Sequence, residues 1–497
     1  MSHNIADAFI AIAQRFPDRP AIESPGGSLS FSQLLDRASR VGELLRRAHV
    51  KTGDRIGIAQ TNNAEAFVLM LAAWLRGATA LVVDFRTRAA ERKKLSHRLG
   101  IKFFLEDRAA PGADSYNSVK NDDAWAEEEA RVESTSIPAS LMGNPIAVIG
   151  VSSGTSGLPQ PVALSHSCLY MRAAMTMTMP DWQHGCRLMA SAPLSFTATR
   201  MHVTACLLDG GSVYFPPLLT SSEVLVEAMD TSGATAMLTV PTTVRGLMSL
   251  AESNRCLFPS VKYLMCCGAP MAGNEKVAAQ EKLTTGFLEC YGSTMAGTIT
   301  LLERKDIAAH GGSVGRPLPH VRVQIVDDQH RPVPAGEVGT IRVRTPGVAE
   351  PLSLGTGEDE RRRDDMLING WIYPGDLGVL DDDGFLRIVG RSADIIIRGG
   401  VNVYPSEVEG VIEQHEAVAE AAVVGWPDQM LGEEVAAFVV LRSEVEPRAI
   451  LAHCRSRLEP DKQPREIFII DAMPRNANGK LMKRELVDRL PARQPVA

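Results

Sequence analysis

Apolar and polar residues alternate along the N-terminal part of the chain with the periods of helices and of strands. Apolar side chains recur on one helical face over Ile5–Phe16, and Ser32 can cap a second helix of this kind. Apolar runs at Arg55–Ala59 and Ala80–Val83 predict strands, and the apolar stretch Ala64–Arg76 between them predicts a buried helix. This alternation predicts a parallel sheet covered by helices.

The same alternation resumes after Leu188 and gives way to shorter strands after about Gly311. In the first of these parts, strands are predicted at Val213–Phe215, Ala236–Val240 and Tyr263–Cys266. In the second, turns rich in Gly and Pro separate short runs, which is typical of antiparallel β structure. These runs are Val321–Val326, Gly339–Val343 and the predicted hairpin of Leu377–Leu380 with Phe385–Val389.

The residues beyond Arg391 have an α+β pattern of their own. Helices are predicted at Ser406–Gln414 and Pro447–Leu458, and strands at Ala421–Gly425, Ala436–Leu441 and Ile467–Ile470. The expected fold class is therefore α/β, with parallel-rich sheets flanked by helices and a small β-barrel-like part. We expect a large N-terminal domain over residues 1–391 and a small α+β C-terminal domain over residues 392–497.

Composition excludes several function classes. A chain of 497 residues is too long for one hydrophobic core, and its formal net charge of −7 argues against general nucleic-acid binding. We find no pattern of a signal peptide and no apolar stretch long enough to span a bilayer. The eight cysteines have neither C-x-x-C nor zinc-like spacing, so we expect buried thiols and a cytoplasmic protein.

A loop rich in glycine and hydroxyl side chains follows the strand-like run Ile146–Val151. It extends from Ser152 to Val162 and reads SSGTSGLPQPV. Glycine lets the backbone approach a ligand closely, and the N–H groups and hydroxyls can donate to phosphate oxygens. Because no Gly-Lys-Ser/Thr sequence follows, the loop is not a Walker A motif. By itself, such a run is more often a plain surface loop.

Further motifs of this kind decide between the two interpretations. They are Cys267-Gly268-Ala269-Pro270, Cys290-Tyr291-Gly292-Ser293-Thr294, Tyr373-Pro374-Gly375-Asp376, Gly390-Arg391, the run from Arg398 to Glu409, and Pro474 to Lys480. In this order and spacing, the chain closely resembles the adenylate-forming superfamily of acyl-CoA synthetases, nonribosomal adenylation domains and luciferases. The resemblance covers essentially the whole chain, and the run from Gly399 to Glu409 resembles the acyl-CoA synthetase branch.

The resemblance implies an acid–thiol ligase that works in two steps. A carboxylate attacks the α-phosphate of ATP, which gives an acyl-adenylate and pyrophosphate, and the thiol of CoA then attacks the adenylate and releases AMP. The implied cofactors are ATP, Mg²⁺ and CoA, and the implied partner is a small carboxylic acid. The C-terminal domain would swivel between the steps about a hinge at Ala393. The assembly state is open, a homodimer included.

The resemblance also implies residue roles, although each residue alone would be an ordinary turn, core or surface residue. The phosphate loop would contribute Ser153, Gly154, Thr155, Ser156 and Gly157, and Ser152 would contribute to the metal site. Gly268, Ala269 and Pro270 would leave room for adenine, Tyr291 would stack on it beside Gly292 and Ser293, and Thr294 would bond the α-phosphate. Asp376 would accept from the ribose hydroxyls, and Arg391 would contact ribose or phosphate. Arg398, Gly399 and Gly400 would face the thiol channel, and Lys480 would stabilise the charge that builds up during adenylation.

Four features depart from the family's pattern. Gln160 and Pro161 stand where Lys and Gly are usual, so a charge that meets the β- and γ-phosphates is missing. Met295 replaces a Glu that helps to hold Mg²⁺, and a thioether is a poor ligand for a hard cation. Ala393 replaces Asp or Lys at the hinge, and Phe196 takes the place of an aromatic gate that is often His.

The implied acyl pocket is apolar, which predicts an aromatic or medium-length carboxylic acid. Its lining would be Phe196, Val240, Cys266, Met295 and Ala296. Arg200 could pair with a second carboxylate, but we expect it instead in a salt bridge on a helix surface. Two alternatives to a CoA ligase stay open. One is an adenylating enzyme that loads the phosphopantetheine of a carrier protein, and the other is a drifted nucleotide- or acyl-binding homologue.

Overall fold

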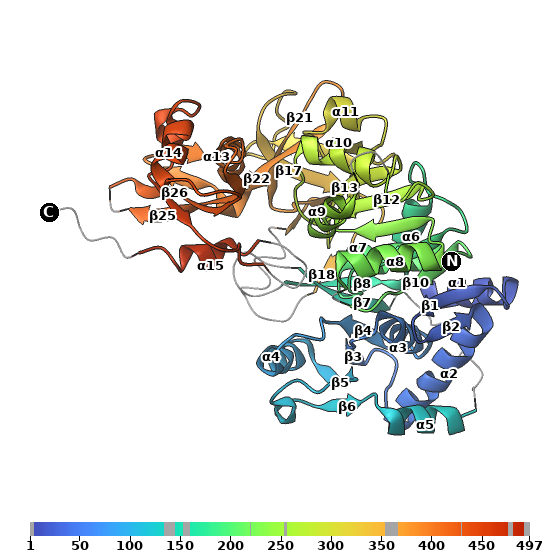
Figure 1. The fold of residues 1–497 in the computed structure, drawn as a ribbon. Coiled ribbons are helices and arrows are strands. Elements are labelled where there is room, and N and C mark those ends of the chain that lie inside the picture. Colours follow the sequence, from blue (N-terminus) through green and yellow to red (C-terminus); the bar gives the residue numbers. More distant parts are fainter. Residues whose placement is uncertain are drawn as a thin grey trace. The chain divides into compact units, whose positions relative to one another are not determined.

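The chain forms two compact units in the computed structural model. The first comprises Met1–Val323 and Val343–Ile372, and the second comprises Gln324–Arg342 and Tyr373–Ala497. Figure 1 shows their elements, coloured along the chain. The structure describes residues 4–133, 145–152, 160–218, 220–252, 256–352, 366–428, 430–475 and 481–491.

A nine-stranded sheet forms one half of the first unit, in the order β15-β14-β13-β12-β11-β9-β10-β1-β2. Its strands from β13 to β1 pair in parallel, whereas both edges are antiparallel. The inner strands are buried on both faces, which explains why they read as short continuous apolar runs. The strands are β1 (Pro20–Ser24), β2 (Gly27–Ser30), β9 (Arg187–Ala190), β10 (Ser212–Tyr214), β11 (Ala236–Thr239), β12 (Tyr263–Cys267), β13 (Phe287–Ser293), β14 (Gly297–Leu302) and β15 (Arg316–Pro317).

A seven-stranded sheet forms the other half, in the order β18-β8-β7-β4-β3-β5-β6. Its strands from β7 to β6 pair in parallel, as the sequence predicts, whereas β8 returns antiparallel to β7. The return strand was not predicted, because its apolar residues follow the glycine-rich loop without a turn signal of their own. The strands are β3 (Arg55–Ala59), β4 (Thr79–Val82), β5 (Ile101–Glu106), β6 (Ser118–Lys120), β7 (Ile146–Ser152), β8 (Gln160–Ser165) and β18 (Glu350–Pro351).

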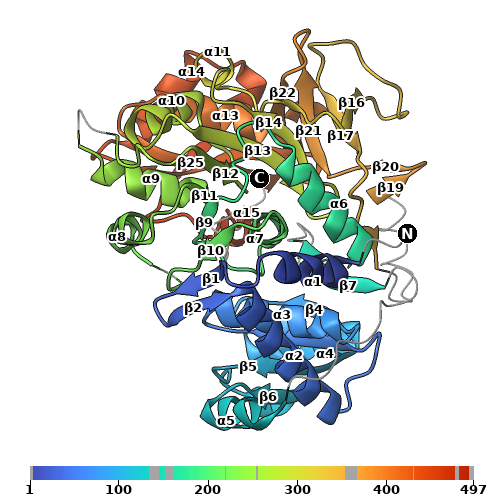
Figure 2. The ribbon, with the colours of Figure 1, turned by 90° about the vertical axis from the view of Figure 1, so that its right-hand side faces the viewer.

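Helices of the first unit pack between the two sheets and on their outer faces. Helix α1 contacts α3, α6 and α7 in the layer between the sheets (Figure 2). Helix α2 begins two residues earlier than predicted, because Ser30, and not Ser32, forms the capping box with Gln33. The helices are α1 (Ile5–Arg15), α2 (Phe31–Arg47), α3 (Asn63–Leu75), α4 (Ala89–Leu99), α5 (Asp123–Arg131), α6 (His166–Met177), α7 (Thr197–Leu208), α8 (Ser222–Ser232), α9 (Pro241–Leu250), α10 (Gly273–Lys282) and α11 (Ile307–His310).

Short antiparallel strands follow, as predicted for the region after Gly311. Strand β17 (Gly339–Arg344) pairs with β16 (Arg322–Val326). The C-terminal end of β17, which belongs to the first unit, pairs through Val343 with β20 (Trp371–Ile372). Strand β20 in turn pairs with β19 (Leu367–Ile368). In the second unit, β17 pairs with β21 (Asp376–Leu380), which forms the predicted hairpin with β22 (Leu386–Arg391).

The C-terminal part of the second unit is a five-stranded sheet with an apolar cluster on each face. The order is β24-β23-β26-β25, and β27 pairs in parallel with β26. Helices α13 and α14 contribute to one cluster, and α15 contributes Leu486 to the other. The elements are β23 (Ile396–Arg398), β24 (Val401–Val403), α13 (Pro405–Ile412), β25 (Val418–Asp428), β26 (Gly432–Leu441), α14 (Pro447–Arg455), β27 (Glu466–Ile469) and α15 (Lys483–Val487).

These observations confirm the predicted α/β class, and the domain boundary at residue 391 stays a prediction. All eight cysteines are free thiols, and only Cys256 is partly exposed. Within the described ranges, no helix has both the length and the apolar character that a membrane crossing requires.

Candidate active site

The β13–β14 hairpin carries the predicted adenine and α-phosphate residues. The last part of β13 consists of Tyr291, Gly292 and Ser293, which pair with β14. Thr294 lies in the turn. A Cβ atom on Gly292 would lie 2.4 Å from the carbonyl oxygen of Gly297, so only glycine permits this close pairing. The hairpin therefore fixes where Thr294 leaves the sheet.

Thr294 packs against the strand that leads into the glycine-rich loop. A Cβ atom on Gly150 in β7 would lie 2.9 Å from the Thr294 methyl carbon, so the absence of a side chain there lets the two sheets meet. The predicted loop residues Ser153–Gly157, the side chains of Ser152 and Gln160, and Lys480 lie outside the described residues. The structure thus brings Thr294 to the strand that precedes the loop, and the roles of the loop residues stay predictions.

The predicted gate lies against the predicted adenine loop. Gly268 follows β12 with φ of +100°, a conformation that favours glycine, and a Cβ atom on it would lie 3.0 Å from Cζ of Phe196. Ala269 and Pro270 continue this loop. On the other side, Asn63 holds the gate segment by accepting from the Leu194 N–H and donating to the Ala192 carbonyl, each at 3.1 Å.

The expectation for Arg200 is wrong. Its side chain is not in a surface salt bridge but is buried in α7, with 2% of the residue exposed. Nη1 donates to the Leu194 carbonyl at 2.7 Å, and Arg200 forms no ion pair within the described part of the chain. Burial, together with the charge of Arg172, lowers the pKa of Arg200 to about 10. Arg200 therefore supports the gate segment from inside the unit.

The predicted acyl-pocket residues are apolar and largely buried. Cys266, Met295 and Ala296 are each at most 2% exposed, whereas Phe196 and Val240 are half-buried. Burial raises the pKa of the Cys266 thiol well above its ordinary value, so this group is neutral near pH 7. Its Sγ lies 3.7 Å from the sulfur of Met271. Such surroundings suit the apolar part of an acid.

The described residues of the β13–β14 turn do not fit a magnesium ion. Met295 brings a thioether where the resemblance leads one to expect a carboxylate, and Mg²⁺ requires oxygen ligands. No group of three or more His, Cys, Asp or Glu residues that could hold a metal occurs among the residues whose placement is described. A magnesium ion at this turn would therefore depend on ligands other than the side chain at position 295.

Sequence reasoning missed Arg172, which lies in α6 directly behind the hairpin. Its guanidinium donates to the carbonyl oxygens of Thr294 and Met295 at 3.0 and 2.5 Å. The signal was a single arginine in a helix sequence, HSCLYMRAAMTM, that has no other Arg and no Lys, Asp or Glu. Farther along β13, Glu289 forms a buried ion pair with Lys276 at 2.5 Å, and burial raises the pKa of Glu289 to about 7.

In the second unit, the predicted ribose residues face each other across the β21–β22 hairpin. Asp376 and Arg391 occupy opposite positions, and their side chains form an ion pair at 2.8 Å. Asp376 is 5% exposed. The Ser392 N–H donates to the Gly375 carbonyl at 3.0 Å, and the predicted hinge residue Ala393 follows in an exposed 3₁₀ turn. The hairpin thus fixes Asp376 and Arg391 immediately before the predicted hinge.

The predicted thiol-channel residues form a second tight hairpin. Gly399 and Gly400 connect β23 and β24 with φ of +59° and +89°, as a two-residue turn that favours glycine at both positions requires. Arg398 pairs with the buried carboxylate of Glu434 and donates to the Pro460 carbonyl at 3.2 Å. Arg398 therefore anchors the hairpin, and its predicted contact with a ligand stays untested.

Comparison with known proteins places this geometry in a family. Residues 9–351 match the family described as AMP-binding enzyme, and residues 407–480 match its C-terminal domain. The chain is 28% identical to the fatty acid–acyl-carrier-protein ligase ScoC of Streptomyces coeruleorubidus, over 96% of this chain and 94% of that protein. It is 29% identical to the 2-succinylbenzoate–CoA ligase of Bacillus subtilis, over 96% of both, and to the feruloyl-CoA synthase of Amycolatopsis sp, over 95% and 96%.

Solved structures agree along the whole chain. The o-succinylbenzoate CoA synthetase of Bacillus subtilis in complex with its acyl-adenylate intermediate has a TM-score of 0.88 and 27% identity, and the match covers 98% of this chain and 99% of that one. The same synthetase with ATP and a magnesium ion has a TM-score of 0.86 and 28% identity, over 96% and 98%. The predicted resemblance is confirmed, and the chain belongs to the AMP-binding enzyme family.

Proposed function

We propose that this protein is an ATP-dependent acyl- or aryl-CoA ligase, which forms an acyl-adenylate and then a thioester. The observation that carries the proposal is the meeting of three predicted elements in the first unit. Thr294 packs on the strand that enters the glycine-rich loop, and Phe196 packs on Gly268. Two buried apolar residues of the predicted pocket adjoin them in the chain, since Met295 follows Thr294 and Cys266 precedes Gly268 by two residues. A phosphate-binding side and an apolar side in one place are what joining an acid to a nucleotide requires.

The relatives support this class of reaction. Two of the three relatives are named as enzymes that join an acid to CoA, and a solved relative holds an acyl-adenylate. ScoC is named as a ligase for an acyl carrier protein, which favours the alternative acceptor. We therefore keep CoA as the proposed acceptor and carrier-bound phosphopantetheine as the second candidate.

The proposed substrate is an aromatic or medium-length apolar acid. Cys266, Met295 and Ala296 offer no charge, and the Arg200 guanidinium is engaged with the Leu194 carbonyl. The proposed cofactors are ATP, CoA and Mg²⁺, with the magnesium ion bound mainly through the phosphates of ATP, because the side chain at position 295 supplies no oxygen. The proposed location is the cytoplasm.

A pyrophosphate-release assay over a panel of carboxylic acids tests the proposal. Aromatic and medium-length acids should release pyrophosphate with ATP, and AMP formation should depend on CoA. Pyrophosphate release that ignores CoA but responds to a phosphopantetheinylated carrier protein would favour the second candidate. Silence over the whole panel, in a protein that still binds AMP, would contradict ligase activity.

Lys480→Ala provides a variant at a site that only the resemblance predicts. If Lys480 stabilises charge in the adenylation step, its removal should slow pyrophosphate release by about 10²–10³, the usual effect of losing one transition-state donor. AMP affinity should change much less, because the charge develops only during the reaction. Lys483→Ala is the matched control, since that lysine lies three residues on and pairs with Glu409. Adenylation at the wild-type rate in Lys480→Ala would disprove the assignment.

A further inference from the structure

Arg172 is a buried arginine whose guanidinium donates to three backbone carbonyls. Arg172 is 2% exposed. Each nitrogen of its guanidinium donates to one carbonyl oxygen: Nε to that of Gly347 at 2.7 Å, Nη1 to that of Thr294 at 3.0 Å, and Nη2 to that of Met295 at 2.5 Å. The side chain therefore ties three separate segments together: helix α6, the β13–β14 turn and the stretch before β18.

Two glycines make the space for this side chain. A Cβ atom on Gly347 would lie 2.8 Å from Cγ of Arg172, and one on Gly297 would lie 3.3 Å from its Nε. The φ of +74° at Gly297 favours glycine irrespective of Arg172. Gly347 does not have a positive φ, so the space for Arg172 is the reason for glycine there. Close packing around the guanidinium means that the Thr294 carbonyl cannot shift without breaking its bond to Nη1.

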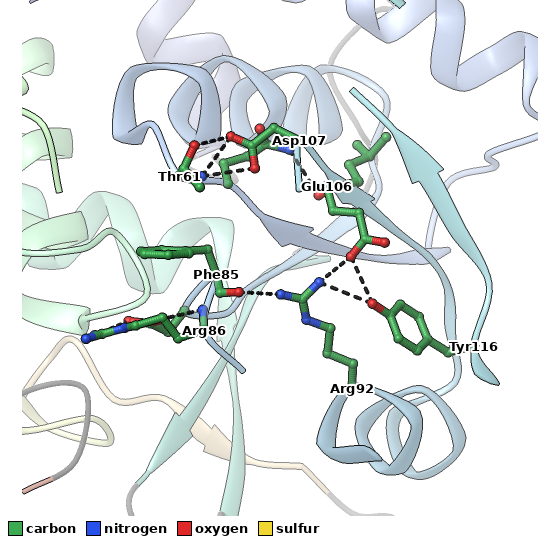
Figure 3. A network of polar contacts seen from close by, with 10 residues as sticks. Thr61, Phe85, Arg86, Arg92, Glu106, Asp107 and Tyr116 are labelled. Carbon is green, nitrogen blue, oxygen red and sulfur yellow. Dashed lines mark hydrogen bonds and ion pairs between the residues drawn. The ribbon is translucent and has the colours of Figure 1, made fainter. Parts of the chain in front are cut away.

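In the described part of the chain, no carboxylate forms an ion pair with Arg172. Buried arginines are normally neutralised, as Arg92 is by Glu106 in the same unit (Figure 3). Neither Arg172 nor Arg200 has an ion-pair partner among the described residues, and the two are close enough for Arg172 to lower the pKa of Arg200. Positive charge that has no ion-pair partner among the described residues, and that lies beneath the β13–β14 turn, favours the binding of an anion at that turn.

We propose that Arg172 is a positioning residue of the nucleotide site, which holds Thr294 in place and supplies a fixed positive charge that favours the phosphate of ATP and of the adenylate. The inference rests on the proposed function, because it takes Thr294 as the contact of the α-phosphate. The polarised carbonyls of residues 294 and 295 belong to the peptide units that form the turn, so the charge acts where the phosphate is expected. Met295 is uncharged, so no side chain of the described turn from Ser293 to Ala296 opposes this positive charge.

Arg172→Lys tests the proposal, with Arg92→Lys as the matched control. Lysine keeps the charge but cannot reach three carbonyls, so the dissociation constant for ATP should rise about tenfold to hundredfold, the effect of losing a charge-assisted hydrogen bond. The KM for ATP should rise in parallel, while the KM for the acid changes little. Arg92→Lys disturbs a buried arginine that contacts the Phe85 carbonyl and Glu106, and it should lower Tm while ATP affinity stays unchanged.

A second variant covers the case in which Arg172→Lys does not fold. Gly347→Ala keeps the arginine but places a methyl group against its Cγ, so ATP affinity should fall severalfold. Wild-type ATP affinity in both folded variants, or an equal loss of affinity in Arg92→Lys, would overturn the proposal.

The measurement separates this proposal from the proposed function. ATP and AMP affinities are measured by calorimetry without acid or CoA. Suppose that the wild-type protein binds ATP but activates no acid, and that Arg172→Lys weakens ATP binding. This result would support the role of Arg172 and refute ligase activity. A wild-type protein that binds neither nucleotide would refute both.

Discussion

Asp376 and Arg391 hold each other in place at the end of the β21–β22 hairpin. Their ion pair at 2.8 Å orients the carboxylate, and the low exposure of Asp376 limits the water that competes for its oxygens. A carboxylate in such a fixed position is well suited to accept two hydrogen bonds from a ribose. The same pair also stabilises the hairpin, so its two roles have to be separated by experiment.

Asp376→Asn should weaken ATP binding without unfolding the hairpin. Asparagine keeps the shape but loses the charge, so the KM for ATP should rise about tenfold to hundredfold. Asp381→Asn is the control, because this carboxylate accepts from backbone N–H groups in the turn of the same hairpin. Steady-state kinetics at varied ATP should show the effect only in the first variant. An unchanged KM in Asp376→Asn would remove this residue from the site.

Sequence reasoning at this scale failed where burial decides what a residue does. Gly268 lies against Phe196, and Thr294 lies against Gly150 in the strand that enters the loop, whereas the roles of these residues in the site stay predictions. Arg172 and Arg200 were missed or misjudged, because their partners are backbone carbonyls. Every residue has a carbonyl, so no sequence pattern marks which of them will accept from a distant arginine.

Tight hairpins carry much of the predicted site at the scale of elements. The β13–β14 hairpin presents Thr294, the β21–β22 hairpin presents Asp376, and the β23–β24 hairpin presents Gly399 and Gly400. The sequence predicted the second hairpin from its turn residues. It did not predict that Tyr291 lies within a strand, because glycine at position 292 suggests a loop, and only the pairing with Gly297 shows why glycine is needed there.

Gly400→Ala should affect the thioester step more than the adenylation step. Alanine at φ of +89° costs roughly 1–2 kcal/mol, which would distort the turn that the resemblance assigns to the thiol channel. CoA-dependent AMP release should slow, while the pyrophosphate burst before CoA is added should stay unchanged. Gly384→Ala, in the β21–β22 turn with φ of +80°, carries the same strain and should spare the CoA step. Equal slowing in both variants would argue against a specific role for the β23–β24 turn.

At the scale of the whole molecule, buried histidines link stability to pH. Burial lowers the pKa of His166 and of His202 to about 4 in the folded protein, against an ordinary value near 6.5. The unfolded chain therefore binds more protons than the folded chain between these two values. The stabilisation is fully present above pH 6.5 and is lost as the pH falls towards 4. Glu289, whose pKa is raised to about 7, acts in the opposite direction.

His166→Gln isolates one of these contributions. At pH 5, protonation of each of these histidines in the unfolded chain should lower the free energy of unfolding by about 2 kcal/mol. The variant should lack the contribution of His166. Urea unfolding at pH 7.5 and 5 measures the difference, and the variant should be less sensitive to acid than the wild type. An identical drop in both proteins would show that His166 titrates normally in the folded state.

The glycines around Arg172 have a consequence for the history of the chain. Positions 172, 297 and 347 are far apart in the sequence, yet one side chain fills the space that the other two leave empty. A side chain at position 347 would crowd the Cγ of Arg172, so arginine at position 172 is accommodated best when position 347 is glycine. We expect positions 172 and 347 to change together across relatives. A survey of these two positions would then separate relatives that have a buried cation behind the β13–β14 turn from relatives that do not.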